Sequence, residues 1–482
     1  MSRFVRASKY RHVFGTPSKR DQCFDNVRVS QSAWDTNLVK ANAQYISINW
    51  NAVGGGSFAV IPVAQTGKQL DSLPLFAAHT GTVLDTDFHP FNDHVIASGA
   101  EDCKVMIWTI PEGGPKESVT APTVTLTGHQ RKVGHVLFHP TADNVLASAG
   151  ADFAVKLWDI EHAAEKIDLT GHGELIQSLT YSWTGDRLAT TCKDKIMRVF
   201  DLRSRTAAVE TPGHQGIKGS RAAWMGDLDK IVTTGFSRTS DRQIWIWDLK
   251  NPKTPLKTMD LDQSSGILMP FYDKETSMLF LAGKGDGNIS YWEWDEAATD
   301  LFSLSEYKSS DAQRGIGFAP KRACNVSANE VARAYKVHPG MVEPISFTVP
   351  RRADTFQADI FPDCPGDQPS LTAAEFFAHT DVSKPLPEPK LVSLEGGFKA
   401  TNAGRAFTAS ASANDLSSSA ATGNSVALAS LAAGKPDPTE LATVIKTQAS
   451  EIEQLKSDAV QKDLRIKQLE AQLAAAQLLV KN

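Results

Sequence analysis

The stretch VIASGAEDCKVMIW at residues 95–108 sets the pattern of this chain. It holds two runs of small and β-branched residues separated by a short polar turn, which is typical of a β-hairpin. The stretches VLASAGADFAVKLW at 145–158 and RLATTCKDKIMRVF at 187–200 repeat it. In each stretch an Asp lies six residues before the closing aromatic residue, and a Ser or Thr lies four residues before that Asp. Recurrence at this fixed spacing indicates a repeat architecture built from β-strands.

A histidine precedes each hairpin at a nearly constant distance from the closing aromatic residue. The interval is 29 residues for His79 and His129 and 28 residues for His172. These residues resemble the Trp-Asp repeat (WD40) family, whose members fold as β-propellers with four antiparallel strands in each blade. The resemblance implies that the His, the hydroxyl, the Asp and the aromatic residue form one buried hydrogen-bonded network that locks each blade. The predicted network residues are His79, Ser98, Asp102, Trp108, His129, Ser148, Asp152, Trp158, His172, Thr190 and Asp194.

Three of these residues, His79, Ser98 and Asp102, also have the residue types of a hydrolase triad. A triad needs one copy together with an oxyanion hole, whereas this set recurs in successive repeats. The glycine-rich segments 54–57 and 283–287 match neither a phosphate-binding loop nor a dinucleotide-binding motif. We therefore expect no catalytic residue, no cofactor and no metal site, and we predict that the chain is not an enzyme.

The repeats predict an all-β fold, a seven-bladed WD40 β-propeller over residues 1–350. Residues 34–64 read as a divergent first blade, residues 260–294 as a blade that lacks the leading His, and residues 302–349 as a weaker seventh blade. A closed ring leaves no open edge strand. We therefore expect YRHVF at residues 10–14 to supply the last strand of the seventh blade and to join the two ends of the propeller.

Composition and charge indicate the cellular environment of the protein and the kinds of partner it can bind. The five cysteines are far apart and form no Cys-x-x-Cys pair, which fits a reducing, cytoplasmic environment. No apolar run approaches the roughly 20 residues that a membrane helix needs. Six basic residues precede the first acidic residue, Asp21, in a chain with a net charge of -5. This basic arm is either a solvated terminus or a contact for an anionic partner; we expect no nucleic-acid partner and no transmembrane segment.

The composition changes after the propeller repeats. Residues 351–400 hold several Phe residues among Pro-rich turns and are predicted to be an extension packed on the propeller. Residues 401–437 are rich in Ala, Ser, Asn and Gly and are predicted to be a low-complexity linker. Residues 438–482 follow a heptad pattern that predicts an oligomerising coiled coil, with a lone amphipathic helix as the alternative. Its predicted core positions include Ile445, Ile452, Leu455, Ile466, Leu469 and Leu473.

Several segments outside the repeats resemble the coronin family. They include SKYRHVFG at 8–15, FDNVRVS at 24–30, SAWD at 32–35, LMPFYD at 268–273 and EPISFTVPRR at 343–352. The resemblance extends over residues 1 to about 400, and it implies a non-enzymatic protein that binds actin filaments through its propeller.

The resemblance also implies partners and site residues. It marks Arg28, in FDNVRVS, as an actin contact, and Lys19 and Arg20 are expected to assist it. It implies a role in actin dynamics with the Arp2/3 nucleation complex and cofilin, and a location in the cytoplasm at the cortical actin cytoskeleton. The segment from Arg465 to Glu470 resembles the trimerisation motif of coronin coiled coils, so a homotrimer is expected, with a tetramer or an antiparallel bundle as the alternatives. A general WD40 scaffold that assembles signalling or trafficking complexes without binding filaments is the alternative.

Overall fold

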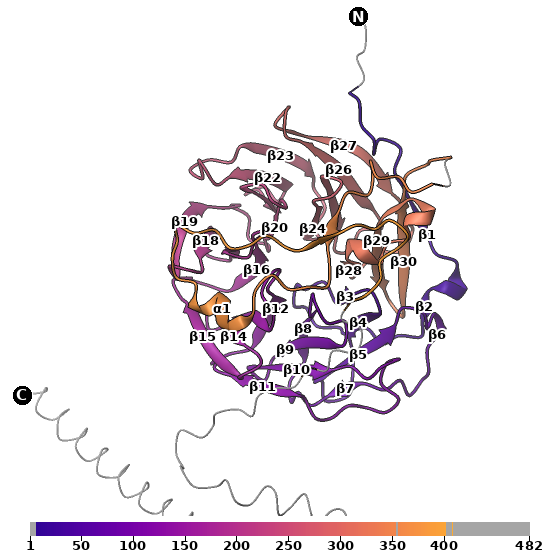
Figure 1. Ribbon diagram of the computed structural model, residues 1–482, viewed down its shortest axis with the longest axis vertical. Coiled ribbons are helices and arrows are strands. Elements are labelled where there is room, and N and C mark those ends of the chain that lie inside the picture. Colours follow the sequence, from indigo (N-terminus) through magenta and orange to yellow (C-terminus); the bar gives the residue numbers. More distant parts are fainter. Residues whose placement is uncertain (1–5, 353–354, 402–406, 408–482) are drawn as a thin grey trace, which may run out of the picture. The chain divides into compact units, whose positions relative to one another are not determined.

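Seven β-sheets stand around a central axis and form a closed ring (Figure 1). The structure is a computed structural model that describes residues 6–352, 355–401 and 407. The predicted seven-bladed β-propeller is confirmed. Within each of the first six sheets the hydrogen-bonded order of the strands is their order in the chain, and the first strand lies nearest the axis.

The six regular blades each contain four strands. Blade 1 comprises β3 (Val39–Ala41), β4 (Tyr45–Asn49), β5 (Ser57–Pro62) and β7 (Phe76–Ala77). Blade 2 comprises β8 (Val83–Phe88), β9 (Val95–Ala100), β10 (Lys104–Thr109) and β11 (Val124–Thr127). Blade 3 comprises β12 (Val133–Phe138), β13 (Val145–Gly150), β14 (Val155–Asp159) and β15 (Ala164–Leu169). Blade 4 comprises β16 (Ile176–Tyr181), β17 (Arg187–Cys192), β18 (Ile196–Asp201) and β19 (Thr206–Pro212).

Blades 5 and 6 follow the same plan. Blade 5 comprises β20 (Arg221–Trp224), β21 (Lys230–Phe236), β22 (Arg242–Asp248) and β23 (Lys257–Asp262). Blade 6 comprises β24 (Leu268–Asp273), β25 (Met278–Gly283), β26 (Ile289–Asp295) and β27 (Asp300–Tyr307).

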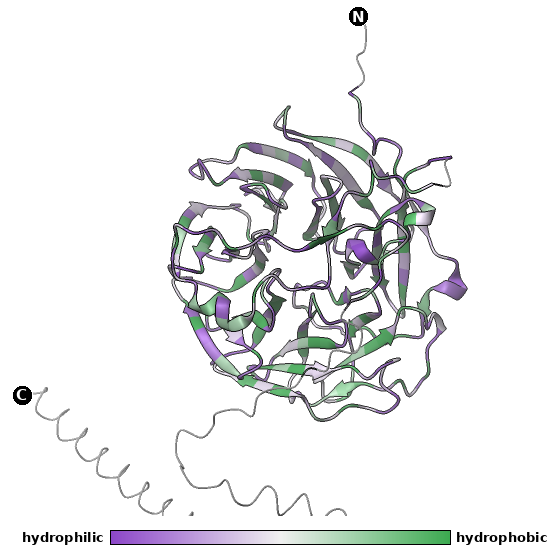
Figure 2. Ribbon diagram, in the orientation of Figure 1, coloured by the Kyte–Doolittle hydropathy of each residue, from purple (hydrophilic) through white to green (hydrophobic). Residues whose placement is uncertain are grey.

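Apolar residues hold neighbouring blades together. Strands β9, β13 and β25 are buried along their whole length, so both faces of these sheets contact other blades. Between blades 1 and 2, the rings of Phe58, Phe76 and Trp108 pack with centroids 5.1 to 5.7 Å apart. Figure 2 shows the hydrophobic residues concentrated on the strands, whereas the short helix η1 (Arg20–Gln22) is hydrophilic. The core is thus divided among the contacts between blades.

Blade 7 closes the ring with strands from both ends of the chain. It combines β28 (Gly315–Phe318), β29 (Glu330–His338) and β30 (Met341–Thr348) with β1 (Phe14–Pro17) and β2 (Phe24–Asp25), both of which pair with β30. A two-residue strand, β6 (Gly67–Lys68), adds to β2. The helices η2 (Lys321–Ala323) and η3 (Val326–Ala328) lie between β28 and β29.

The closing strand lies later in the chain than residues 10–14, where it was predicted. Of those residues only Phe14 pairs with β30. Tyr10 and Val13 are buried in the core of blades 6 and 7 beside Phe347, and the Val13 amide donates to the Tyr10 carbonyl in a turn. Tyr10 and Val13 therefore fill the core, and the strand begins at the exposed Phe14.

The loops of the propeller lie on two faces. Since successive strands are antiparallel, the hairpins between second and third strands lie on the same side as the links between blades, here called the link face. The remaining hairpins lie on the opposite side, here called the extension face. The extension contacts the extension face at blade 3, where Leu371 bridges to Ala142 and the Ser370 amide donates to the Thr141 carbonyl.

Residues 355–401 form little regular structure. Helix α1 (Ala373–Ala378) begins at Thr372 with a capping box that pairs Thr372 with Glu375. Strands β31 (Cys364–Pro365) and β32 (Leu391–Val392) pair with each other. No helix of the described ranges is long and apolar enough to cross a membrane. The predicted coiled-coil residues, among them Ile445, Ile452, Leu455, Arg465, Ile466, Leu469, Glu470 and Leu473, lie outside the described residues, as does most of the predicted linker.

Candidate functional site

Blades 2 and 3 bring their predicted network residues together. In blade 2 the Trp108 indole Nε1 donates to Ser98 Oγ at 2.8 Å, and Ser98 Oγ lies 2.8 Å from His79 Nε2. The other imidazole nitrogen, Nδ1, lies 2.9 Å from Asp102 Oδ2. One tautomer satisfies all three contacts, because the serine can donate to Nε2 while Nδ1–H donates to the carboxylate.

Blade 3 has the same arrangement. The distances are 2.8 Å from Trp158 Nε1 to Ser148 Oγ, 2.7 Å from Ser148 Oγ to His129 Nε2 and 3.0 Å from His129 Nδ1 to Asp152 Oδ2. In both blades the carboxylate also accepts from the backbone amide of the residue after the histidine. Burial raises the pKa of the Asp152 carboxyl, but the hydrogen bonds from His129 and from these amides outweigh it and hold the pKa below its usual value.

Blade 4 departs from the predicted network. His172 Nε2 lies 2.9 Å from Thr190 Oγ1, as expected, but Nδ1 contacts the Phe153 carbonyl at 3.2 Å instead of Asp194. Asp194 pairs with Arg198 at 2.8 Å. The prediction that Asp194 binds His172 is therefore wrong, because a guanidinium on the next strand is the stronger partner for the carboxylate. Phe200 stands at the indole position and has no donor.

Blades 5 and 6 replace further members. In blade 5, Thr233 Oγ1 lies 3.0 Å from His214 Nε2 and accepts from Trp247, but Gln243 takes the place of the aspartate at 3.4 Å. Asp241, at the expected spacing, is held within its own turn by Ser237. The spacing rule therefore missed Gln243.

Blade 6 lacks the leading histidine, as the sequence indicated. Arg242 of blade 5 reaches Asp286 at 2.6 Å and Asp262 at 2.6 Å, and thereby supplies the cation to the turn of blade 6. The only sequence signal for this contact was an Arg in strand β22 followed by a repeat that has no His. These networks hold a blade together or join it to the next blade, so their role is structural.

Arg28 lies on the link face, in the connection from β2 to β3. Its side chain is exposed, and it forms no hydrogen bond or ion pair with any described residue. Its backbone is fixed, because the neighbouring Val27 amide donates to Gly340 of blade 7 and the Arg28 carbonyl accepts from Asn51 of blade 1. The Arg28 guanidinium is thus exposed on a rigid backbone and forms no ion pair with a described residue. Arg28 does not act as a salt-bridged residue inside a blade.

The other two predicted contacts lie on the N-terminal segment near β2. Lys19 is exposed and precedes η1, and Arg20, within η1, is 81% exposed and pairs with Asp25 at 3.3 Å. The backbone hydrogen bond from Gln69 to Asp25 joins this segment to the loop after β6. Exposed ion pairs of this kind contribute little to stability, so both cations are available to a partner.

The SAWD segment at residues 32–35 crosses the link face, a role that the sequence did not indicate. Trp34 Nε1 donates to the Gly134 carbonyl of blade 3 at 3.0 Å, and the Lys132 ammonium lies 4.7 Å from the indole centroid. Asp35 pairs with Lys284 of blade 6 at 3.1 Å. The segment that carries Arg28 is therefore attached to four blades.

A cavity of about 630 Å³ lies along the axis and opens towards the extension face. Two of its lining lysines form ion pairs: Lys321 pairs with Asp273, which also lines the cavity, and Lys40 pairs with Asp87. In the part of the chain that the structure describes, no group of three or more His, Cys, Asp or Glu side chains could hold a metal ion.

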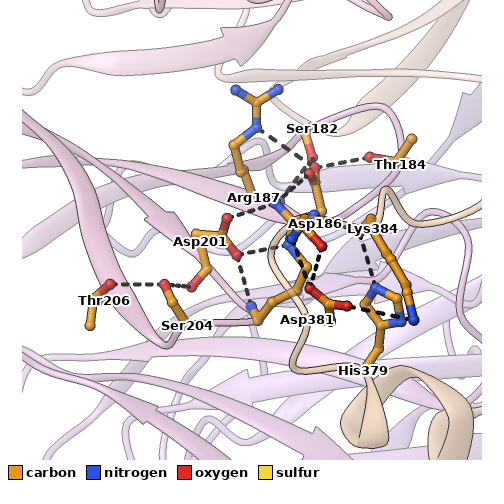
Figure 3. Close-up of polar contacts among 12 residues, drawn as sticks. Ser182, Thr184, Asp186, Arg187, Asp201, Ser204, Thr206, His379, Asp381 and Lys384 are labelled. Carbon is orange, nitrogen blue, oxygen red and sulfur yellow. Dashed lines mark hydrogen bonds and ion pairs between the residues drawn. The ribbon is translucent and has the colours of Figure 1, made fainter.

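Figure 3 shows how blade 4 holds the extension. Arg203 donates to the Lys384 carbonyl at 2.9 Å and pairs with Asp201 and Asp186 at 2.7 and 3.3 Å. His379 contacts the same carbonyl at 3.1 Å. Nearby, Phe376 packs against His139 with centroids 4.4 Å apart. The extension is thus attached to the extension face by charge and by apolar contact.

Comparisons with known proteins agree with this architecture. Residues 3–68 match a family model described as a domain of unknown function (DUF1899). Residues 68–109, 120–159 and 165–201 match the WD domain, G-beta repeat, and residues 342–383 match a further type of WD40 repeat.

Curated relatives extend the match over most of the chain. Coronin-A of Dictyostelium discoideum is 50% identical over 398 residues, which cover 83% of this chain and 88% of that protein. The coronin-like protein of Saccharomyces cerevisiae is 49% identical over 402 residues, covering 80% of this chain and 60% of the yeast protein. The match to that relative therefore spans less than two thirds of its length.

A solved structure supports the fold. The WD40 domain from Toxoplasma gondii coronin superposes with a TM-score of 0.75 at 30% identity, covering 80% of this chain and 98% of that domain.

Replacing His129 by Ala should lower the free energy of unfolding by about 1–3 kcal/mol, because Ser148 and Asp152 lose a buried hydrogen-bond partner. Urea melts of the full-length protein measure the change. His12→Ala is the matched control, since His12 is exposed. A His129→Ala protein as stable as this control would show that the network contributes nothing to stability.

Stability should also fall in mild acid. Burial lowers the pKa of His214 to about 4, and burial together with the charge of Arg198 lowers that of His172 to about 4. An unfolded imidazole titrates near 6.5, so between about pH 6.5 and 4 the unfolded state binds more protons. Each histidine should then cost about 1.4 kcal/mol per pH unit as the pH falls through this window.

The variant His214→Gln tests this pH dependence. Glutamine can still contact Thr233 but does not titrate, so urea melts across the window should show a shallower loss of stability than in the wild-type protein. The exposed His12→Gln variant should keep the wild-type slope. An unchanged slope in His214→Gln would contradict the lowered pKa.

Proposed function

The chain belongs to the coronin family, and on that premise we propose that it binds actin filaments through its propeller and crosslinks them as an oligomer. Arg28 carries the proposal. It stands at the position that the FDNVRVS segment marks, and its guanidinium is exposed and unpaired on a backbone held by two blades. Its desolvation in a complex breaks no internal ion pair, so contact with an acidic filament surface gains charge complementarity at little cost.

Lys19 and Arg20 extend the positive surface beside Arg28. Both are exposed, and backbone hydrogen bonds tie η1 to β2 and β6. Charges at the rim of an interface mainly raise the association rate. We assign Arg28 the specific contact and the other two cations the steering of the encounter.

Oligomerisation would convert single contacts into filament crosslinking. The heptads in residues 438–482, with the Arg465 to Glu470 segment, support a homotrimer. Joined weak sites can bind about 10² to 10⁴ times more tightly without any new contact. Regulation of actin dynamics with the Arp2/3 complex and cofilin, and a cytoplasmic location at the cortical cytoskeleton, are proposed from family membership.

Arg28→Asp should weaken co-sedimentation with actin filaments by about tenfold or more at low salt, because it places a carboxylate against an acidic surface. Lys253→Asp makes the same charge change on the extension face, at an exposed residue without contacts among the described residues, and should bind like wild type. Normal binding by a well-folded Arg28→Asp protein would exclude Arg28 from the interface. Failure of the wild-type protein to bind would favour the scaffold alternative.

Truncation after residue 437 should yield a monomer that binds filaments more weakly and bundles them poorly, since it loses the linkage between propellers. Light scattering reports the mass, and low-speed sedimentation reports bundling. A full-length protein that is monomeric at micromolar concentration contradicts the coiled-coil assignment. If truncation changes the mass but not the affinity or the bundling, the coiled coil serves another purpose.

A further inference from the structure

A second group of basic side chains lies on the link face, far from Arg28, and none of them forms an ion pair with a described residue. It lies on three adjacent loops: the β17–β18 hairpin, the link from β19 to β20, and the β21–β22 hairpin. One exposed aliphatic residue, Ile217, lies among its exposed basic side chains. The group, called here the blade 4–5 patch, consists of Lys193, Lys195, Ile217, Lys218 and Arg238.

Backbone contacts fix the loops of the patch. The Gly216 amide donates to the Phe236 carbonyl at 2.7 Å, which holds the β19–β20 link against the start of the β21–β22 hairpin. Lys195 Nζ donates to the Gln215 carbonyl at 2.8 Å, and the Lys218 ammonium lies 4.9 Å from the Phe236 ring centroid. Ile217, Lys193, Lys195 and Lys218 line the same shallow pocket. The three lysines and Ile217 therefore share one surface, and the bond from Gly216 to Phe236 holds the hairpin that carries Arg238 against it before any partner binds.

Ile217 is 89% exposed, although the loop around it is well anchored. An exposed aliphatic side chain on a rigid loop among cations has the composition of a binding hot spot, in which an apolar anchor is surrounded by polar residues. Lone exposed apolar residues are common on protein surfaces, so Ile217 marks a binding surface only together with the charges that surround it.

The acidic neighbours of the patch compensate only part of its positive charge. Asp194 is balanced by Arg198, whereas Asp241 accepts from the neutral donors Ser237 and Gln263, keeps its negative charge and offsets one of the four cations. Lys193 and Arg238 form no side-chain hydrogen bond or ion pair with the described residues. In a chain whose net charge is -5, this local excess of cations selects an acidic partner.

The topology places the patch and Arg28 on one face. Both lie on links between blades or on hairpins between second and third strands, and these all belong to the link face. Figure 1 shows β2, which precedes Arg28, and β19, which precedes Ile217, on opposite sides of the ring. A partner that covers this face could therefore reach both.

We propose that the blade 4–5 patch is a second contact with the actin filament, and that it takes an acidic segment with an apolar side chain packed on Ile217. This inference rests on the proposed function. An anionic membrane fits less well, because the patch exposes one aliphatic residue and none of the exposed Trp or Phe residues that favour the bilayer interface. The acidic protein segment uses both properties of the patch, its charge and its single apolar anchor.

Two variants of the full-length protein test the proposal by co-sedimentation with actin filaments. Lys193→Glu with Arg238→Glu changes two side chains without described contacts and should weaken binding about tenfold at low salt, with a smaller effect at high salt. Ile217→Ser should weaken binding several-fold at every salt concentration, because its contact is apolar. The matched control, Lys116→Glu with Lys253→Glu, makes the same charge change at two exposed residues of the extension face and should bind like wild type.

The outcomes separate this inference from the proposed function. If Arg28→Asp weakens binding while both patch variants match the control, the second contact is overturned and the proposed function stands. If the wild-type protein does not bind filaments, both are overturned. A parallel sedimentation experiment with vesicles that contain phosphatidylserine tests whether the patch binds an anionic membrane. Loss of vesicle binding in the patch variants, with unchanged filament affinity, would assign the patch to a membrane and overturn the proposal.

Discussion

In blades 2 to 5 one buried hydroxyl lies between an imidazole and the closing aromatic residue, and the geometry of the link face depends on it. Ser98, Ser148, Thr190 and Thr233 each lie within 3.0 Å of a histidine Nε2. The histidine belongs to the link between blades, whereas the hydroxyl belongs to the second strand. A buried polar group without a partner is costly, so this contact fixes each link against its blade.

The remaining member of the network is less restricted than the hydroxyl. The histidine Nδ1 contacts a carboxylate in blades 2 and 3, the Phe153 carbonyl in blade 4 and the Gln243 amide in blade 5. Each group offers an acceptor at the same place, and that is the requirement a buried N–H imposes. The propeller therefore tolerates a change of residue type at the position that faces histidine Nδ1, as long as the new group accepts a hydrogen bond.

These constraints leave the two faces with different roles. Residues 355–401 cover part of the extension face, where Arg203 and the apolar contacts of Phe376 hold them. The link face carries fixed loops with exposed cations, at Arg28 and at the blade 4–5 patch, that form no ion pair with the described residues. Rigid elements that present charged loop residues are a common basis for recognition, and the closed ring provides that rigidity because blade 7 joins both ends of the chain.

The sequence by itself determined the all-β propeller, the networks of blades 2 and 3 and the missing histidine of blade 6, because each depends on spacing within one repeat of the chain. It also marked Arg28 by resemblance. Only the tertiary structure decided that β1 begins at Phe14, that Arg198 takes Asp194 from His172, and that Trp34 reaches Gly134 of blade 3. Such contacts depend on which atoms lie nearest in the folded ring, and the spacing of residues along the chain carries no record of that.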